Sequence, residues 1–438
     1  MDKLKYVLIG AGNRGGNYSK YGYEQGHFEL VGVAEPDDFI RNYFREKYNI
    51  PAENCFRSYE ELLAKDKFAD FAMITTQDKM HFAPAMMAIE KGYDLLLEKP
   101  VAPTPEECFA IAEAAEAKGV KALVCHVLRY TPFARKVKEI IDSGMLGKIC
   151  SVVHTECVGN IHYSHSFVRG NWRNSDLSSD MLLAKSCHDI DILQWLLGSE
   201  CKKVQSFGRQ TYFTKANCPE GAPKRCVEGC PASGDCPYDA VKIYRDFSYE
   251  EGGWLLCAAT CREHPTDEDI ERVLHESPYG RCVFQCDNNV VDHQTVNLEY
   301  ENGETVVFTM AAFNKGGRRI HIMGTKGELI STDFNTMSLF LYCDEDKKSP
   351  RYGHNKEVFI DSKEGEIEQT AAGGHGGGDA GIMRDLWMLL GEGKTTKSIS
   401  DIRTSVKNHL TVFAAEQSRK NGGITVDVDE FVESLRKK

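Results

Sequence analysis

The first 125 residues alternate short apolar runs with longer amphipathic segments. The apolar runs have the length of buried strands, and they cover residues 6–12, 28–36, 69–76, 94–100 and 121–127. The segments between them have helical spacing and cover residues 14–25, 37–48, 81–92 and 104–119, the last with Thr104 and Glu107 as a predicted cap. Apolar strands that alternate with helices are typical of a parallel sheet buried on both faces. We therefore predict an α/β domain over residues 1–125 with a doubly wound parallel sheet.

The pattern changes near residue 149. Later runs at 290–313 and 318–332 are rich in β-branched residues and contain the turn dipeptides Asn302-Gly303 and Lys326-Gly327. These features predict antiparallel meander strands. We expect residues 126–438 to form an α+β domain with an open antiparallel sheet and two C-terminal helices, at 381–393 and 403–420. Residues 214–280 fit neither pattern, because they are rich in Cys, Pro, Gly and charge, and we interpret them as an insertion.

Composition narrows the class of protein. Of 438 residues, 42% are apolar and 27% are charged, which is an ordinary globular balance. The net charge is −12 with scattered basic residues, which argues against a nucleic-acid partner. No apolar run approaches the ~20 residues that cross a bilayer, and the N-terminal segment has the features of a strand rather than an export signal. Most of the 16 cysteines stand singly in apolar stretches. We expect a cytoplasmic protein without membrane contact.

A glycine fingerprint follows the first predicted strand. Gly10, Gly12 and Gly15 form G-x-G-x-x-G around Ala11, Asn13 and Arg14, and the acidic Glu35 lies at the end of the second strand. This spacing is typical of Rossmann dinucleotide binding, in which the helix N-terminus binds the pyrophosphate and the acid binds the adenosine ribose. No arginine adjoins Glu35 in sequence, and its carboxylate would repel a 2′-phosphate, so we predict NAD rather than NADP. The alternative is a glycine turn that binds nothing.

The tripeptide Glu98-Lys99-Pro100 follows the fourth predicted strand. Ligands bind at the carboxyl ends of parallel strands, so Lys99 is a candidate for contact with cofactor and substrate. Proline restricts the backbone of Lys99 and can fix the turn, including as a cis bond. From the residues alone, Lys99 is as easily a solvated lysine.

Several segments together resemble the Gfo/Idh/MocA family of oxidoreductases, the glucose–fructose oxidoreductase and inositol dehydrogenase type. The matching elements are Gly10–Gly15, Thr75–His81, Glu98–Pro100, Arg129-Tyr130 with Pro132, Gly144-x-x-Gly147, Trp172-Arg173 and His188-x-x-Asp191. The resemblance covers almost the whole chain except the insertion. It implies an NAD(P)-dependent oxidoreductase acting on sugars, cyclitols or related polyols, and we expect a homo-oligomer formed through the C-terminal sheet.

The resemblance also implies roles for particular residues. Lys99 and His188 would be catalytic, with His188 as acid/base on the reacting hydroxyl and Lys99 stabilising the alkoxide. Besides the glycine fingerprint, Glu35 and Lys99, the cofactor contacts would come from the matching motifs: Thr75, Thr76, His81, Glu98, Arg129, Trp172 and Arg173. Without the family, His188 is more simply a buried histidine bonded to Asp191.

The chain departs from the family pattern before this histidine. Many members carry Asp four residues earlier, where this chain has Ala184. Lys185 either lies beside Lys99, where a second cation lowers the pKa of Lys99 or suits an acidic substrate, or points away from the site.

Two further groups are candidates on sequence alone. The run from His375 to Asp379 is either a flexible lid over the substrate or a loop in which Asp379 caps a helix. The polar loop before Trp172 carries His162, His165 and Arg169, which either line the sugar pocket or have no role.

The insertion contains a cluster of thiols. Cys218, Cys226, Cys230 and Cys236 lie within 19 residues, framed by proline and glycine. Four thiols can hold a structural zinc or an iron–sulfur cluster, although the spacing matches neither C-x-x-C knuckles nor a ferredoxin run. Free thiols and disulfides are the alternatives, and Cys257-x-x-x-Cys261 and Cys282-x-x-x-Cys286 leave the ligand set open.

Three functions remain open from the sequence. The first is a dehydrogenase that exchanges NAD freely and oxidises a sugar or cyclitol. The second is a glycosidase that retains NAD, oxidises C3 transiently, eliminates the aglycone and then reverses the redox step. The third is an NAD-binding regulator without catalysis.

Overall fold

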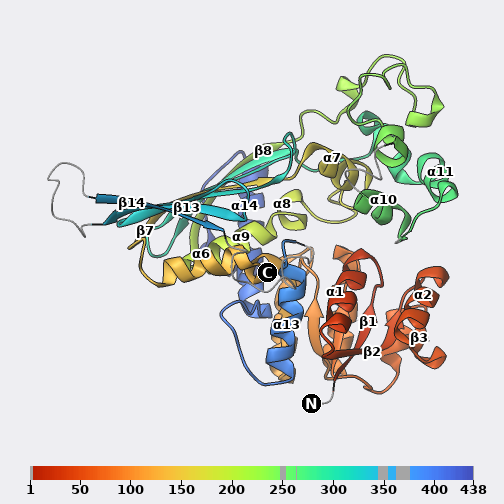
Figure 1. Ribbon diagram of the computed structural model, residues 1–438, viewed down its shortest axis with the longest axis horizontal. Coiled ribbons are helices and arrows are strands. Elements are labelled where there is room, and N and C mark those ends of the chain that lie inside the picture. The colour runs from red at the N-terminus through yellow and green to blue at the C-terminus, as the bar shows by residue number, and fades with distance from the viewer. Residues whose placement is uncertain (1–2, 247–252, 263, 344–353, 362–374, 438) are drawn as a thin grey trace.

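The computed structural model describes residues 3–246, 253–262, 264–343, 354–361 and 375–437. Two sheets organise these residues, one in each half of the molecule (Figure 1). No helix among the described residues combines the length and apolarity needed to cross a membrane.

The first sheet has six parallel strands in the order β3-β2-β1-β4-β5-β6, the arrangement of a doubly wound Rossmann domain. Its strands are β1 (Leu4–Ile9), β2 (Phe28–Ala34), β3 (Cys55–Phe56), β4 (Phe71–Ile74), β5 (Asp94–Leu97) and β6 (Ala122–Val124). Its helices are α1 (Asn13–Glu24), α2 (Asp38–Tyr48), α3 (Tyr59–Ala64), α4 (Phe82–Glu90) and α5 (Pro105–Lys118). The predicted parallel sheet is confirmed, and Thr104 caps α5 by accepting from the backbone N–H of Glu107. The sequence did not reveal β3 and α3, because a two-residue edge strand leaves no periodic signal.

The second sheet has nine strands in the order β14-β13-β12-β11-β7-β10-β9-β8-β15. Its strands are β7 (Ile149–Cys157), β8 (Cys201–Arg209), β9 (His293–Tyr300), β10 (Thr305–Ala311), β11 (Gly317–Gly324), β12 (Gly327–Ser331), β13 (Thr336–Cys343), β14 (His354–Asp361) and β15 (Val426–Asp427). The sheet is mostly antiparallel, as predicted, but β7 and β10 pair in parallel. Asn302-Gly303 joins β9 to β10, and Lys326-Gly327 leads from β11 into β12.

One face of the second sheet is covered by helices. Apolar residues alternate along β9 and β10, so that Val296, Leu298, Val306 and Phe308 point into one core. The helices of this half are α6 (Pro132–Asp142), α7 (Asn160–Tyr163), α8 (Met181–Ala184), α9 (Cys187–Leu197), α14 (Ile402–Lys420) and α15 (Val428–Arg436). Of these, α14 packs against β8, α5 and α9, so it touches both domains.

Helix α13 (Gly378–Leu390), which follows the second sheet in the chain, packs into the core of the Rossmann domain. Its Met383, Leu386 and Trp387 are buried with Tyr6 and Phe28 of the Rossmann sheet, and it packs against α1. A segment that follows the second sheet in the chain therefore returns to the first domain, where it lies beside the glycine loop (Figure 1).

The insertion forms a small subdomain. It contains short turns and the helices α10 (Gly253–Thr260) and α11 (Asp267–His275), whose apolar residues make a separate core around Tyr244, Leu256 and Leu274. Arg169 is fully buried and donates to the carbonyls of Arg281 and Tyr238, and this ties the insertion to the second domain.

Candidate functional site

The glycine loop has the shape that a pyrophosphate requires. Gly10 has a φ of +86°, and a Cβ on Gly15 would lie 2.6 Å from the carbonyl oxygen of Gly10. A Cβ on Gly12 would meet nothing within 4 Å, so this side of the loop is open. The N-terminus of α1 has neither a side-chain cap nor an acidic residue in its first turn. Its N–H groups are therefore left for an anion.

Glu35 closes the far side of this loop. Its carboxylate accepts from the backbone N–H of Ala11 at 2.9 Å and of Asp37 at 3.1 Å, which fixes it at the end of β2 beside the glycines. Arg41, one turn into α2, donates to the carbonyl of Glu35 at 2.5 Å and pairs with Asp38. This arginine was missed from the sequence because it lies six residues beyond Glu35. Asp38 is shared between Arg41 and Arg57, since Arg57 lies 3.1 Å from its other oxygen.

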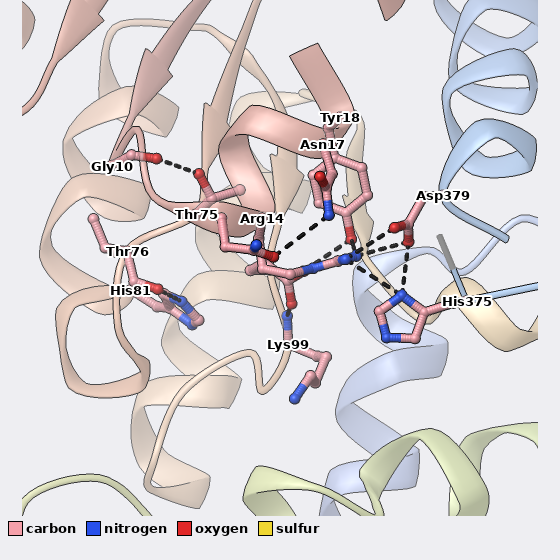
Figure 2. A network of polar contacts seen from close by, with 12 residues as sticks. Gly10, Arg14, Asn17, Tyr18, Thr75, Thr76, His81, Lys99, His375 and Asp379 are labelled. Atoms are coloured by element: carbon pink, nitrogen blue, oxygen red, sulfur yellow. Dashed lines mark hydrogen bonds and ion pairs between the residues drawn. The ribbon is translucent and has the colours of Figure 1, made fainter. Parts of the chain in front are cut away.

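Arg14 joins three parts of the chain in one polar network (Figure 2). Its guanidinium donates to Glu98 at 2.8 Å and to Asp379 at 2.8 and 2.9 Å, and it also contacts the hydroxyl of Tyr18. Asp379 is fully buried in the first turn of α13. The contacts of Asp379 therefore hold α13 against Arg14 of the glycine loop. Asp379 does not cap α13.

The residues after β4 brace the loop that carries Lys99. Thr75 donates to the carbonyl of Gly10 at 2.6 Å, and Thr76 to that of Met80 at 2.8 Å. The ring nitrogens of His81 lie 2.6 Å from the carbonyl of Pro100 and 3.0 Å from that of Thr76. The Lys99–Pro100 bond is cis. The side chains of these three predicted cofactor residues thus make internal contacts that hold the site in shape.

Lys99 reaches from the Rossmann domain into the second domain. Its ammonium group donates to the backbone carbonyl of Ala184 at 2.6 Å. This is the position where many family members carry Asp, so a carbonyl dipole partners Lys99 in place of a carboxylate. The contact lies at the end of α8, immediately before the helix that carries His188.

His188 is buried beside two other imidazoles. No residue that the structure describes hydrogen-bonds to its Nδ1, and its ring lies 5.7 Å from that of His126 and 6.3 Å from that of His375, centroid to centroid. Burial, together with Lys99 and His126, lowers the pKa of His188 well below its ordinary value. The lowered pKa favours the neutral imidazole of His188 and makes it a weaker base than an ordinary histidine.

The hydrogen bonds of Asp191 go to residues other than His188. Both of its oxygens accept from Arg129 at 2.6 Å, and Asn408 donates to it at 2.5 Å. Arg129 and Asp191 are both buried. The structure thus places Arg129, a predicted cofactor residue, in a bidentate ion pair that joins the turn after β6 to α9.

Lys185 is buried and close enough to Lys99 for the two charges to interact. Its ammonium group is 3.4 Å from Glu156, and Arg318 bridges Glu156 and Asp189 at 2.7 and 2.8 Å. Burial lowers the pKa of Lys185, Glu156 opposes that shift, and Lys99 is close enough to add to it. Glu156 and Arg318 were missed because single charged residues in strands carry no sequence signal.

His375 is held by a buried carboxylate. Its Nδ1 lies 3.1 Å from Asp379 and 3.3 Å from Arg14, and its backbone has a φ of +53°. Burial and Arg14 lower the pKa of His375, whereas Asp379 raises it. The loop therefore places a second imidazole across from His188.

The other predicted side chains are more dispersed. Trp172 donates to Asp78 at 2.9 Å, and Arg173 pairs with Asp287 at 2.8 Å. His162 packs edge-on to Trp254 of α10 at 5.0 Å, and His165 bonds the hydroxyl of Tyr244 at 2.7 Å. Trp172 and Asp78 link the two domains, whereas His165 contacts the insertion and Arg173 holds Asp287, which follows it.

The predicted metal site is not formed. Among the described residues, no three His, Cys, Asp or Glu side chains are placed so that they could hold one metal ion. Cys226, Cys230 and Cys236 line one small cavity together with Cys282, but Cys218 is outside this lining and contacts Gln285. All described cysteines are free thiols. Burial raises the pKa of Cys226 and Cys236.

Comparisons with known proteins cover both domains. A family model described as "Oxidoreductase family, NAD-binding Rossmann fold" matches residues 4–126, and one described as "Oxidoreductase family, C-terminal alpha/beta domain" matches residues 138–428. The chain is 25% identical to the putative oxidoreductase YteT of Bacillus subtilis over 83% of this chain and 82% of that protein. It is 30% identical to inositol 2-dehydrogenase of Burkholderia cenocepacia, over 36% of this chain and 44% of that one.

Solved structures share the fold over nearly the full length. An inositol dehydrogenase homolog from Azotobacter vinelandii, complexed with NAD+, has a TM-score of 0.67 at 16% identity and covers 97% of each chain. An oxidoreductase domain protein from Kribbella flavida has a TM-score of 0.71 at 18% identity, covering 98% of this chain and all of that one.

Proposed function

The chain belongs to the Gfo/Idh/MocA family of oxidoreductases, and from this membership we propose that it is an NAD-dependent dehydrogenase acting on a sugar or cyclitol hydroxyl. The observation that carries the proposal is the contact between Lys99 and the carbonyl of Ala184. It brings the end of β5, where the cofactor binds in such sheets, against the start of the helix that carries His188.

The residues divide the work of alcohol oxidation between them. Lys99 is a cation whose visible partner is a neutral carbonyl, so it can stabilise negative charge on the reacting oxygen. His188 is neutral because of its lowered pKa and can take the hydroxyl proton. When bound, the nicotinamide accepts the hydride. The open glycine loop, the uncapped α1 and the fixed Glu35 support binding of that dinucleotide, and Glu35 supports NAD over NADP.

The test is turnover. The purified protein is incubated with NAD and a panel of sugars, uronates and cyclitols, and NADH is followed by absorbance. We expect one class of polyol to give NADH, with Lys99→Ala lowering the rate by ~10²–10⁴, the range for a positioned catalytic group. Equal rates in wild type and Lys99→Ala would contradict the proposal, and NAD binding without turnover on any panel would support a regulator.

A second function is favoured by His375. A glycosidase that retains NAD needs one group for the redox step and a second base to remove the C2 proton. His375, whose lowered pKa favours the neutral imidazole, is oriented by Asp379 and lies 6.3 Å from His188, ring to ring, so it would supply such a second group. In this reaction the C3 hydroxyl is oxidised, the C2 proton is removed, the aglycone leaves, and addition of water with return of the hydride restores the sugar. Cleavage of aryl glycosides without net NADH, lost in His375→Asn, would favour it over the dehydrogenase.

The exposed face of the second sheet supports the proposed homo-oligomer. Val153, Val307, Phe207 and Ile330 are 39–53% exposed, and all four point away from the helices. Val307 stands directly opposite Val153 in the register of the sheet, and His321 separates this pair from Ile330. Light scattering should give a multiple of the 49.1 kDa chain mass. Val307→Asp should shift the protein toward the monomer.

A further inference from the structure

The insertion returns to the Rossmann domain at one turn. Arg262 follows the end of α10, and its guanidinium carbon lies 4.1 Å from the ring centroid of Phe39. Phe39 is in the first turn of α2, four residues after Glu35, and half of its surface is exposed. Figure 1 shows α10 and α11 on the side of the molecule that faces α2. The insertion thus touches the Rossmann domain beside the end of β2.

The position of Arg262 is set from within the insertion. Its Nε lies 2.9 Å from Asp269, a buried carboxylate in the first turn of α11. The other oxygen of Asp269 accepts from the backbone N–H of Thr266 at 3.0 Å and its hydroxyl at 2.8 Å, so the carboxylate is itself held by a capping box. Arg262 is therefore aimed at Phe39 by a rigid element and is not a freely mobile surface side chain.

A neighbouring residue confirms that this turn stands close to the ribose-binding end. Cys261, directly before Arg262, has its thiol pKa raised by burial and then by the carboxylates of Glu35 and Asp37. Both carboxylates belong to the end of β2, where the adenosine ribose binds in this type of domain. The turn at residues 261–262 therefore lies over the adenosine side of the site, not over the reacting end at Lys99.

We infer that the contact between Arg262 and Phe39 is a latch that covers the adenosine end of the cofactor site and slows dinucleotide release. The inference rests on NAD binding as proposed above, and it adds a role for the insertion that the reaction itself does not need. At the other side of the glycine loop, Arg14 and Asp379 already fasten α13. The dinucleotide would therefore lie between two elements from outside the Rossmann fold, and release would require the Arg262 turn to separate from Phe39.

The expected effect follows from the type of contact. A cation–π contact between partly exposed groups contributes enough to change a rate by ~2- to 5-fold. We therefore expect Arg262→Gln and Phe39→Ala each to speed release by about that factor. The double variant should release no faster than the single variants, because both remove the same contact. Arg245→Gln is the matched control, since Arg245 is another insertion arginine, paired with Glu271 away from the Rossmann domain.

The experiment measures release directly. Each protein is loaded with NADH, mixed rapidly with excess NAD, and the fall in NADH fluorescence gives the dissociation rate. Competition with ADP-ribose and with nicotinamide mononucleotide then locates the effect: Arg262→Gln should weaken ADP-ribose, which contains the adenosine end, and leave the mononucleotide unchanged.

The outcomes separate this inference from the proposed function. Release rates in Arg262→Gln equal to those of wild type and Arg245→Gln would overturn the latch while leaving the dehydrogenase intact. Additive effects in the double variant, or equal weakening of both competitors, would also overturn it, because they indicate general loosening. Failure of the wild-type protein to bind NADH would overturn the proposed function itself.

Discussion

Replacing Arg129 with methionine tests how the turn that follows β6 is held to α9. Arg129→Met keeps the length and apolar stem of the side chain but removes both hydrogen bonds to Asp191, each 2.6 Å long. Asp191 is 0% exposed, so water cannot replace the lost partner. Asn408 remains as a donor to one oxygen at 2.5 Å. The variant therefore leaves a buried carboxylate that is only partly satisfied.

The size of the effect can be worked out from this arrangement. Removing one partner of a buried ion pair costs about 3–5 kcal/mol in the free energy of unfolding. An unfolding entropy of about 2.1 cal/mol/K per residue gives roughly 0.9 kcal/mol/K for a chain of 438 residues that unfolds as one unit. The Tm should then fall by about 3–5 °C.

The loss should depend on pH. Burial already raises the pKa of Asp191 with Arg129 present, and it must rise further without Arg129. A carboxyl group with a raised pKa in the folded state is destabilising above its unfolded pKa, and the penalty grows as pH increases toward the folded pKa. The Tm difference between variant and wild type should therefore be smaller at pH 5 than at pH 8.

Calorimetry of four proteins decides the matter. Arg129→Met is compared with Asp191→Asn, with the double variant and with Arg173→Met, whose partner Asp287 is half exposed. The double variant should recover part of the loss because no buried charge remains, and Arg173→Met should cost less than about 1 kcal/mol. If Arg129→Met is no worse than Arg173→Met, or if the double variant is as unstable as the sum of the singles, the reasoning is wrong.

Three further outcomes follow from the site. Glu35→Ser should narrow a preference for NAD over NADP, measured by titration calorimetry of both cofactors; an NADP preference in the wild type would contradict the role of Glu35. Lys99→Ala and His188→Ala should each lower kcat/KM by ~10²–10⁴ with little change in NAD affinity. The double variant should lose much less activity than the product of the two single losses. Near-normal turnover in His188→Ala would mean that another group is the acid/base, and Lys185 would be the first to test. Burial lowers the pKa of His409 to about 3 and that of His162 to about 2. As pH falls below 6.5, the unfolded chain therefore binds protons that the folded chain does not, and the Tm should decrease from pH 6.5 to 5. The decrease should be smaller in His409→Gln, and a constant Tm of the wild type over that range would refute the prediction.

Local patterns in the sequence determined the elements and the cofactor loop. The apolar runs predicted five of the six Rossmann strands, and Thr104 with Glu107 marked the start of α5. Gly10 and Gly15 showed the tight loop directly, because their roles depend on backbone geometry that only glycine provides. Lys99 became a candidate by its place after a strand and before proline, and its catalytic role was implied only by the family resemblance. In each case the cause lies within a few residues of its effect.

The partners of those residues were decided only by the tertiary structure. The partner of Lys99 is a carbonyl 85 positions away, and Arg14 pairs with Asp379, 365 positions away. From the residues alone, Asp191 was the expected partner of His188, because it lies one helical turn later on the same face. In the fold, Arg129 and Asn408 take its oxygens instead. The grouping of the thiols was also decided by the fold. Cys282, rather than the predicted Cys218, lines the cavity with the other three cysteines. A sequence pattern records period and capping, whereas ion pairs and pockets depend on which distant surfaces the packed core brings into contact.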